Sequence, residues 1–552
     1  MGPNFRDPVR IDFDAAAMEI QGQLGALTLL WLKKEKKKSD DECLEPWNAK
    51  LLSLLDVQVQ KMKSIQFKDA GPLLCNPTAR RLLRAAQERF VFTQMDKASG
   101  NFAVVCKWFY QFRLAEEIFK RDSAYSVTDE LPKNIVERIV KELFDDFLIE
   151  VPELERKLAL YYWTAKMHKS PLGARFIAAM HCCVTKELAR IANLGMTTLL
   201  RFWKKHCNTL KRTTGINYYW IIKNTDHAKM LFSRANRFGN IKDITGLDFS
   251  TLYTSIPHGP LLTALEQFVR GGFELAYASE HPTIKGRIMA IGNKKTSWVK
   301  SRSTKKTKTV YFQAESFLAL ITYQLANVFV QVGDTVLKQD VGIPMGVDNG
   351  PNLANVFLFI REYNWITKKM KTKEGKKMLK AFFDFIGRYI DDLIGLNNNK
   401  MLLKYVSEIY PKELILKLEN VENGEWTPHK ATFLNMVVKL NNNRVLTAPY
   451  DKREAFEFFV NRFFCPLSNI DIKRAHSVIG NTLANTLVTS DMFTDFKIKI
   501  QKEVRRLGDK DASTKWLQSN VKKFFERRPE ACLKYGKTVA ELMTSIFDCV
   551  SS

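Results

Sequence analysis

The stretch Phe385-Ile-Gly-Arg-Tyr-Ile-Asp391-Asp392-Leu-Ile-Gly395 is an apolar run, two adjacent carboxylates and a second apolar run. Two short strands joined at the acidic pair would form a β-hairpin with Asp391 and Asp392 at its tip. Adjacent like charges repel each other, so such a tip becomes favourable when a divalent cation neutralises it. An Asp-Asp turn at the surface is the alternative, and the unbroken apolar flanks argue against it.

A third carboxylate, Asp248, lies in ITGLDFSTLYTSIP (244–257), where a buried strand is expected to enter a turn and then a helix. Mg²⁺ prefers oxygen ligands, and a few carboxylates together with substrate phosphates hold it. Asp248, Asp391 and Asp392 on adjacent strands would hold two such ions for an in-line phosphoryl displacement. These three residues are therefore the predicted catalytic and metal-binding carboxylates of a nucleotidyltransferase that uses Mg²⁺ or Mn²⁺.

The composition indicates a globular, basic protein. Of the 552 residues 45% are hydrophobic, which excludes a disordered chain, and the net charge of +26 favours nucleic acid as the partner. A basic but otherwise ordinary soluble protein is the alternative. The nine cysteines never form a C-x-x-C pair, so we expect reduced core thiols in an intracellular protein. The longest uncharged stretch, 316–333, contains polar residues and is more typical of a buried helix than of a membrane span.

The hydrophobic pattern changes along the chain. Residues 45–160 have mostly helical spacing, and the chain after Pro466 is helical again. Between them, strand-like runs occur at four places, so the middle of the chain is predicted to be mixed α/β. These runs cover residues 243–253, 336–346, 383–396 and 432–440.

Several of these motifs resemble a known family. DFSTLYTSIP (248–257) and RYIDDLIGLNN (388–398) resemble motifs A and C of reverse transcriptases, most closely those of the Penelope-like retroelements, a branch related to telomerase. GIPMG (342–346) followed by NLANVFL resembles motif B of the same family. Four further stretches are similar to that family and occur in the expected order, so that the resemblance covers about residues 90–470: DKASGNFAVVCK (96–107), KMHKSPLGARFIA (166–178), YPKELILKLE (410–419) and YDKREAFEFF (450–459).

The resemblance implies an α/β right-hand polymerase and divides the chain accordingly. It predicts fingers, a palm with an antiparallel sheet backed by helices, and a helical thumb. The activity it implies is an RNA-directed DNA polymerase, with an RNA template, a DNA or RNA primer and deoxynucleoside triphosphates as partners. The predicted parts are a helical N-terminal extension (1–90), fingers with upstream motifs (91–240), a palm with a basic insertion at 285–310 (241–445) and a basic helical thumb (446–552).

The resemblance also assigns nucleotide-binding residues around the carboxylates. Tyr253 matches the steric gate that favours deoxynucleotides, although an aromatic at a helix start is also a common core residue. Met345 and Gly346 lie in motif B, where glycines let the backbone approach a base pair, and the helix 353–365 is expected to pack behind them. Asp348 departs from the family pattern, which has small or polar residues after Met-Gly, and the orientation of its side chain is left open.

Two cations in the fingers motif are candidates for the triphosphate. Arg175 would grip phosphate bidentately and Lys169 would add a point charge, while a solvated charged loop is the alternative. Lys412 or Lys417 would be the general acid to pyrophosphate. Asp96, Lys97 and Asn101 match an upstream motif of the family, and the sequence gives them no physical role. Asn435 occupies a position where the family usually has an acidic residue.

Basic clusters are predicted to contact nucleic acid. Cations neutralise phosphates and an aromatic ring can stack on a base, although each residue could equally lie on a solvated loop. The thumb helices would hold the duplex by shape and charge. The predicted contacts are Lys295, Trp298, Lys305, Lys306, Lys452 and Arg453.

No GIY-YIG endonuclease pair is found in the sequence, so a separate endonuclease or an existing 3′ end would provide the primer. Two other functions stay open. The first is an RNA-directed RNA polymerase, which shares the acidic hairpin, and Tyr253 argues against it. The second is a nucleic-acid-binding protein that derives from a decayed retroelement, and the three intact carboxylates argue against it. The expected location is intracellular and nuclear.

Overall fold

A computed structural model describes residues 77–548 apart from a few short stretches, together with scattered helical positions between 18 and 60. The chain divides into two compact units, Met1–Phe92 with Val104–Lys107, and Thr93–Ala103 with Trp108–Ser552. In the first unit α3 (Pro77–Arg89) is helical, and most of the predicted N-terminal extension 1–90 lies outside the described residues. The stretches left out after residue 77 are 99, 121–122, 170–171, 279–287, 303–308, 459, 461–471, 510–511 and 549–552.

A four-stranded antiparallel sheet occupies the middle of the larger unit. Its strands are β12 (Ile386–Tyr389), β13 (Asp392–Leu396), β6 (Ile244–Ser250) and β14 (Ile415–Leu418), in the spatial order β12-β13-β6-β14. The central strands are almost continuously apolar because both faces of the sheet are covered. The predicted hairpin at the acidic pair is confirmed, and so is the strand that carries Asp248, although this strand continues to Ser250 before the short helix α8 (Leu252–Ser255) begins.

One face of this sheet packs on α7 (Thr225–Phe238) and on the sheet β17 (Lys430–Phe433), β18 (Met436–Asn441) and β19 (Arg444–Pro449). On the other side lies α11 (Gly350–Lys369), whose apolar residues point all around the helix, as expected of a buried one. This helix contains the predicted segment 353–365.

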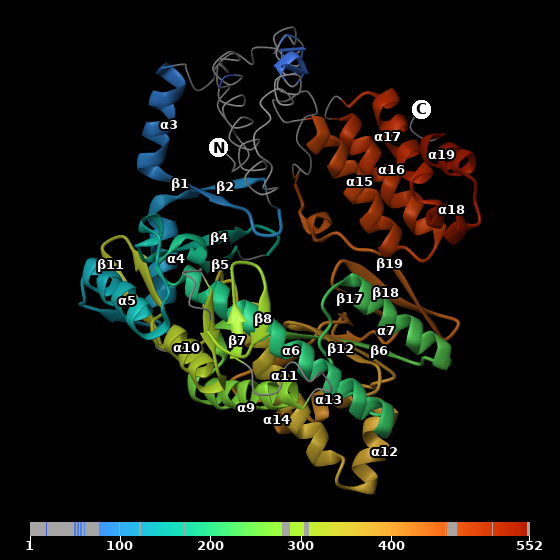
Figure 1. Ribbon diagram of the computed structural model, residues 1–552. Helices are drawn as coiled ribbons and strands as arrows, with labels where there is room; N and C mark the ends of the chain where they lie inside the picture. Colours follow the sequence, from blue (N-terminus) through green and yellow to red (C-terminus); the bar gives the residue numbers. More distant parts are fainter. Residues whose placement is uncertain are drawn as a thin grey trace. The chain divides into compact units, whose positions relative to one another are not determined.

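Helices α6 (Lys186–Thr214), α9 (His258–Tyr277), α10 (Ala314–Ala326) and α11 pack on one another and lie side by side in Figure 1. The apolar stretch 316–333 is helical only to Ala326 and then forms β10 (Phe329–Val332), so the prediction of one helix was partly wrong. Within the described residues no helix is long and apolar enough to cross a membrane.

A five-stranded sheet lies in the first half of the larger unit. Its order is β3 (Tyr125–Thr128), β11 (Thr335–Gln339), β10, β4 (Ala159–Lys166) and β5 (Gly173–Ala178). The prediction that 45–160 is mostly helical was therefore wrong in part, although α4 (Lys107–Phe119) and α5 (Pro132–Phe147) are helices. The short strands depend on partners distant in sequence, since β3 pairs with β11.

The chain after residue 471 forms a helical bundle with its own core, which includes Phe496, Val521 and Phe525 (orange to red in Figure 1). Its helices are α15 (Ile472–Thr489), α16 (Phe493–Gly508), α17 (Thr514–Glu526), α18 (Pro529–Tyr535) and α19 (Val539–Phe547). The helical prediction for this region is confirmed, and the mixed α/β fold class with antiparallel sheets is confirmed for the chain.

Smaller elements complete the description. Buried Cys183 and Cys207 agree with the expected core thiols, whereas Cys106 is exposed. The further elements are β1 (Phe90–Gln94), β2 (Phe102–Cys106), α8 (Leu252–Ser255), β7 (Ile288–Ile291), β8 (Thr296–Val299), β9 (Val310–Phe312), α12 (Lys373–Phe382), α13 (Met401–Lys404), α14 (Val406–Ile409), β15 (Val421–Glu422), β16 (Glu425–Trp426) and the 3₁₀ turns η1 (Glu153–Glu155), η2 (Met180–Cys182) and η3 (Lys452–Ala455).

Candidate catalytic site

The structure brings Asp248, Asp391 and Asp392 together at the edge of the central sheet. Asp392 begins β13 and lies opposite Asp248 in the β13–β6 ladder. The backbone N–H of Phe249 donates a hydrogen bond to the Asp391 carbonyl oxygen at 3.1 Å, which ties the hairpin tip to β6. Carboxylate oxygens of the three residues lie within 4.8 Å of one another, so one divalent cation can contact all three.

The hairpin tip has an unusual backbone. Tyr389 pairs with Asp392, which leaves Ile390 and Asp391 as a two-residue loop. Ile390 has φ of 56°, in the left-handed region that a β-branched residue rarely adopts. Such a conformation costs about 1–3 kcal/mol and persists only where surrounding contacts impose it.

A buried ion pair supplies those contacts. Arg388 on β12 and Glu362 on α11 have fully buried side chains, and the guanidinium donates two hydrogen bonds to the carboxylate, at 2.7 Å and 3.2 Å. Arg388 Nη1 also donates to the Ile390 carbonyl oxygen at 3.1 Å and to Asn355 Oδ1 at 2.8 Å. The Tyr410 hydroxyl donates to Glu362 Oε1 at 2.8 Å. We call these residues the Arg388 network, and it fixes the backbone directly before Asp391.

The carboxylates repel one another strongly. Burial raises the pKa of Asp248 to about 7, and the charges of Glu419, Asp391 and Asp392 add to this effect. Burial and the charge of Asp391 also raise the pKa of Asp392. Two half-buried acids with raised pKa values and a third beside them form an oxygen donor set that fits a divalent cation.

Glu419 is an acidic neighbour that the sequence did not identify. It follows β14, and its backbone N–H donates to the Gly246 carbonyl oxygen at 2.9 Å, so it lies beside the strand that carries Asp248. The only sequence signal was its position at the end of the stretch 410–419. Lys417 lies opposite Asp248 in the β14–β6 ladder, which favours Lys417 over Lys412 as the general acid.

The motif A and motif B segments lock together behind Tyr253. The Tyr253 carbonyl oxygen accepts a hydrogen bond from the Ile343 N–H at 2.6 Å. Gly342 has φ of 86°, and a Cβ there would lie 2.4 Å from that same carbonyl oxygen, so only glycine fits. Burial, and then the negative charge of Asp391, raise the pKa of the Tyr253 phenol, which places the ring close to the acidic cluster.

The other end of the motif B loop rests on β5. The Met345 carbonyl oxygen accepts from the Ala178 N–H at 3.0 Å. Gly346 has φ of 115°, and a Cβ there would lie 2.3 Å from the Ala178 carbonyl oxygen. Asp348 is exposed. Hydrogen bonds to Glu155 and Glu187 raise the pKa of Lys186 and Arg190 of α6, and the charge of Asp348 adds a smaller effect, so Asp348 lies on the side of the loop that faces these cations.

Cations of the fingers segment lie around the acidic cluster. Arg175 on β5 forms an ion pair of 3.3 Å with buried Asp96, which gives the upstream signature a physical role. Burial, then the charges of Lys452 and Arg175, lower the pKa of Lys97. Burial raises the pKa of Asp392 and of Glu419, and the charges of Lys452 and Lys97 oppose this rise at Asp392, as that of Lys169 does at Glu419. Lys97, Lys452 and Lys169 thus lie near the acidic cluster and Arg175 lies near Lys97, where triphosphate oxygens would need cations.

The remaining predicted nucleic-acid contacts lie elsewhere. Lys295 is exposed in the turn between β7 and β8, and Trp298 packs against Phe202, Phe273 and Tyr277. Lys305 and Lys306 lie outside the described residues. In the described hairpin between β17 and β18, Asn435 accepts a hydrogen bond from Thr225 at 3.0 Å.

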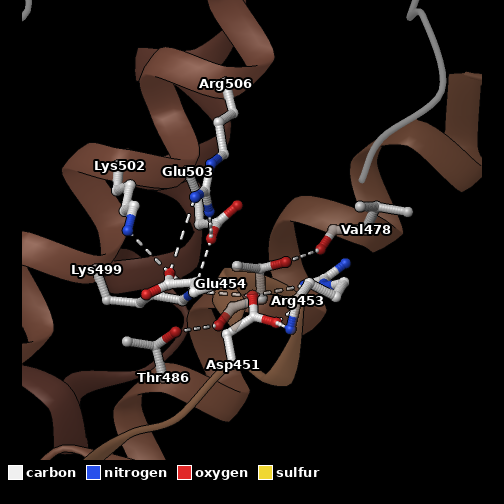
Figure 2. Close-up of polar contacts among 10 residues, drawn as sticks. Asp451, Arg453, Glu454, Val478, Thr486, Lys499, Lys502, Glu503 and Arg506 are labelled. Atoms are coloured by element: carbon white, nitrogen blue, oxygen red, sulfur yellow. Dashed lines mark hydrogen bonds and ion pairs between the residues drawn. The ribbon is translucent and has the colours of Figure 1, made fainter. Parts of the chain in front are cut away.

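Arg453 takes part in a second charged cluster, shown in Figure 2. It donates to both oxygens of Asp451, at 2.9 Å and 3.0 Å. Lys499 on α16 contacts Asp451, Glu454 and Glu503 at 3.1 Å, 3.4 Å and 2.8 Å. Because Arg453, Lys499, Lys502 and Arg506 surround these three carboxylates, protein cations neutralise them without a metal ion. We call these seven residues the thumb-base network.

Comparisons with known proteins find similarity in fold only. No protein-family model and no curated protein matches the chain. Solved structures with a similar fold include the telomerase of Candida albicans in complex with a fragment of telomeric RNA (TM-score 0.49, 12% identity, 85% of this chain and 72% of that chain). Others are apo telomerase from Candida tropicalis (0.39, 11%, 85% and 72%) and the RNA-dependent RNA polymerase of a human picobirnavirus (0.37, 9%, 93% and 88%). The function is therefore argued from the site's own geometry.

Proposed function

We propose that the chain is an RNA-directed DNA polymerase of the Penelope-like type, which extends a primer 3′-hydroxyl with deoxynucleotides on an RNA template. The observation that carries this proposal is the convergence of Asp248, Asp391 and Asp392, distant in sequence, with carboxylate oxygens within 4.8 Å of one another. The rim of cations around an excess of buried negative charge is what a site for metal ions and a nucleoside triphosphate requires.

The roles of the residues follow from their positions. Asp248, Asp391 and Asp392 would hold divalent cations, which when bound polarise the primer hydroxyl and neutralise charge on the leaving group. Arg175, Lys169 and Lys97 would bind phosphate oxygens of the incoming nucleotide. Tyr253 would lie beneath the sugar and exclude a 2′-hydroxyl, and Lys417 would donate a proton to the leaving pyrophosphate.

Three further parts belong to this proposal. The helical region after residue 471 would hold the template–primer duplex through its basic surface. A separate endonuclease or an existing 3′ end would provide the primer. The protein would act in the nucleus, which imaging of a fluorescently tagged chain tests.

Primer extension on an RNA template tests the function. Deoxynucleotide addition that requires Mg²⁺ or Mn²⁺ is expected from the wild type, and Asp391→Asn should reduce it to background because one carboxylate ligand is lost. Asp226→Asn, on an exposed part of α7, is the matched control and should retain activity.

Two outcomes would contradict the proposal. Selective incorporation of ribonucleotides would identify an RNA-directed RNA polymerase. If neither the wild type nor Asp391→Asn extended the primer and both bound RNA equally well, the chain would be a binding protein.

A further inference from the structure

The exposed face of α6 carries a row of cations that the catalytic site does not use. Arg201, Lys204, Lys205 and Arg212 lie three, four and seven residues apart, so they share one face of the helix. Together with Asn208 and Thr209 they line one shallow hollow on the surface. None of these residues belongs to the carboxylate cluster or to its cationic rim.

The opposite face of α6 is firmly held. It buries residues from Leu188 to Cys207, among them Leu199 and Trp203, against α9, α10 and α11. The cations are therefore presented on a rigid rod. From position 201 to 212 the helix rises about 16 Å, a length that allows contacts to several successive phosphates of one nucleic-acid strand.

The row has no internal counter-charge. None of the four cations forms an ion pair with an acidic residue in the described part of the chain. Lys223 adds a further positive charge close to Lys204, whereas the acid that an ion pair brings to this end of the helix, Asp384, contacts Lys211, which is not part of the row. The thumb-base network in Figure 2 is the contrast, since its four cations surround three carboxylates. A row of like charges without acids needs an external anion.

We propose that this face of α6 is a second RNA-binding surface, which contacts the backbone of template RNA outside the catalytic cleft. The lining favours nucleic acid over an acidic protein. Arginine, lysine, asparagine and threonine are the usual phosphate contacts, and the hollow has no aromatic or aliphatic side chain to anchor a protein interface. That the polyanion is RNA rests on the proposed function.

The test is RNA binding by the full chain without nucleotides, so that it does not depend on polymerase activity. Fluorescence anisotropy of a labelled, unstructured 40-nucleotide RNA would be measured at several salt concentrations. The variant with Arg201, Lys204, Lys205 and Arg212 each changed to Gln should bind about tenfold to a hundredfold more weakly. The slope of log K against log salt should fall by about 3, since each lost contact to single-stranded RNA removes about 0.7.

A matched control removes the same charge elsewhere. Lys373, Lys376, Lys377 and Lys380 are exposed on α12, and their change to Gln should leave the slope within about 1 of the wild type. Equal losses in both variants would overturn the proposal, because the effect would then be one of net charge. Polyglutamate and unlabelled RNA would also be compared, at equal concentrations of charge, as competitors of the labelled RNA. If polyglutamate competed as strongly as RNA, the proposal would be overturned in favour of an acidic protein partner.

Crosslinking of the wild-type chain gives a second measurement that no folding defect can affect. RNA containing 4-thiouridine should crosslink to peptides of residues 201–212 and also in the Asp391→Asn protein. Crosslinks confined to other segments would overturn the proposal, whereas crosslinks here without any primer extension would refute only the proposed function.

Discussion

Asp248 is the residue at which burial and mutual repulsion act together most strongly. It lies on the strand β6 opposite Asp392, and Glu419 lies beside the same strand. Its pKa of about 7 means that a proton competes with any cation for this carboxylate near neutral pH. The site therefore couples metal binding to pH over a range in which an ordinary aspartate is already ionised.

The affinity for metal should consequently depend on pH. With a pKa of about 7 for Asp248, about a tenth of the carboxylates are ionised at pH 6 and nearly all at pH 8. We expect the apparent Kd for Mn²⁺ to be about tenfold weaker at pH 6 than at pH 8, measured by titration calorimetry or by electron paramagnetic resonance.

The raised pKa of Asp248 also affects the stability of the metal-free protein. Because the pKa of Asp248 is raised by folding, its carboxylate costs stability as the pH rises from about 4 through 7, and Asp248→Asn removes that cost. In Asp248→Asn the pH dependence of Mn²⁺ binding should flatten. Equal pH dependence in both proteins would show that Asp248 does not titrate in this range.

The sequence could predict the carboxylates but not their supports. Asp391, Asp392 and Asp248 lie in local motifs, in which a carboxylate beside an apolar strand indicates metal binding. Arg388 and Glu362 lie 26 residues apart in the sequence, and only the packing of α11 against β12 shows that they pair. A buried ion pair between distant segments leaves no local pattern in the sequence.

At the level of elements, the β12–β13 hairpin depends on α11. The Arg388 network joins the two, and removal of one partner would leave the other charge buried without compensation. We expect Glu362→Ala to lower the free energy of unfolding by about 3–5 kcal/mol, measured by urea unfolding followed by tryptophan fluorescence.

An exposed ion pair is the control for this prediction. Arg270 and Glu315 lie 3.0 Å apart with both side chains largely exposed, and Glu315→Ala should cost less than about 1 kcal/mol. The double variant Arg388→Met with Glu362→Leu should recover most of the stability, because neither charge stays buried alone. A small loss in Glu362→Ala would mean that Arg388 finds another partner.

The fold was predictable where pattern and pairing are both local. The hairpin at 386–396 and the helices after residue 471 follow from periodicity within one segment. The strands β3 and β4 were missed, because β3 pairs with β11 and β4 with β10, and these pairings override the helical spacing nearby. The turn in 432–440 was also missed, since Leu434 with φ of 57° and Asn435 separate β17 from β18.

At the level of the larger unit, positive charge is used in two different ways. In the row of Arg201, Lys204, Lys205 and Arg212 on α6 it forms no ion pair with an acid of the described residues, whereas in the thumb-base network it neutralises carboxylates between η3 and α16 (Figure 2). Lys452, in the same turn as Arg453, acts on the carboxylates of Asp248 and Asp392. The network therefore joins the helical bundle to a cation beside the acidic cluster through one short 3₁₀ turn.

Lys499 is the centre of that network, because it contacts Asp451, Glu454 and Glu503 and is only 15% exposed. We expect Lys499→Met to cost about 3 kcal/mol at pH 7 and to accelerate hydrogen exchange in α16, since three acids lose their shared cation. Lys522→Met is the control, because the Lys522–Glu526 pair is exposed at 3.8 Å and should contribute less than about 1 kcal/mol.

The pH dependence of the stability loss in Lys499→Met distinguishes the contribution of the Lys499 ammonium charge from that of the packing of its aliphatic stem. Burial alone would raise the pKa of Asp451, but the hydrogen bonds of Arg453 and the charge of Lys499 lower it well below its usual range. A carboxylate with a depressed pKa adds stability that is present above its unfolded value of about 3.9 and is lost as the pH falls through the folded pKa. The difference between wild type and Lys499→Met should therefore persist at about pH 4 and shrink only as the pH falls further toward the folded pKa of Asp451, measured by urea unfolding at pH 7, at about pH 4 and at about pH 2. A difference that stays constant across this range would mean that the aliphatic stem of Lys499, and not its charge, holds α16 to η3.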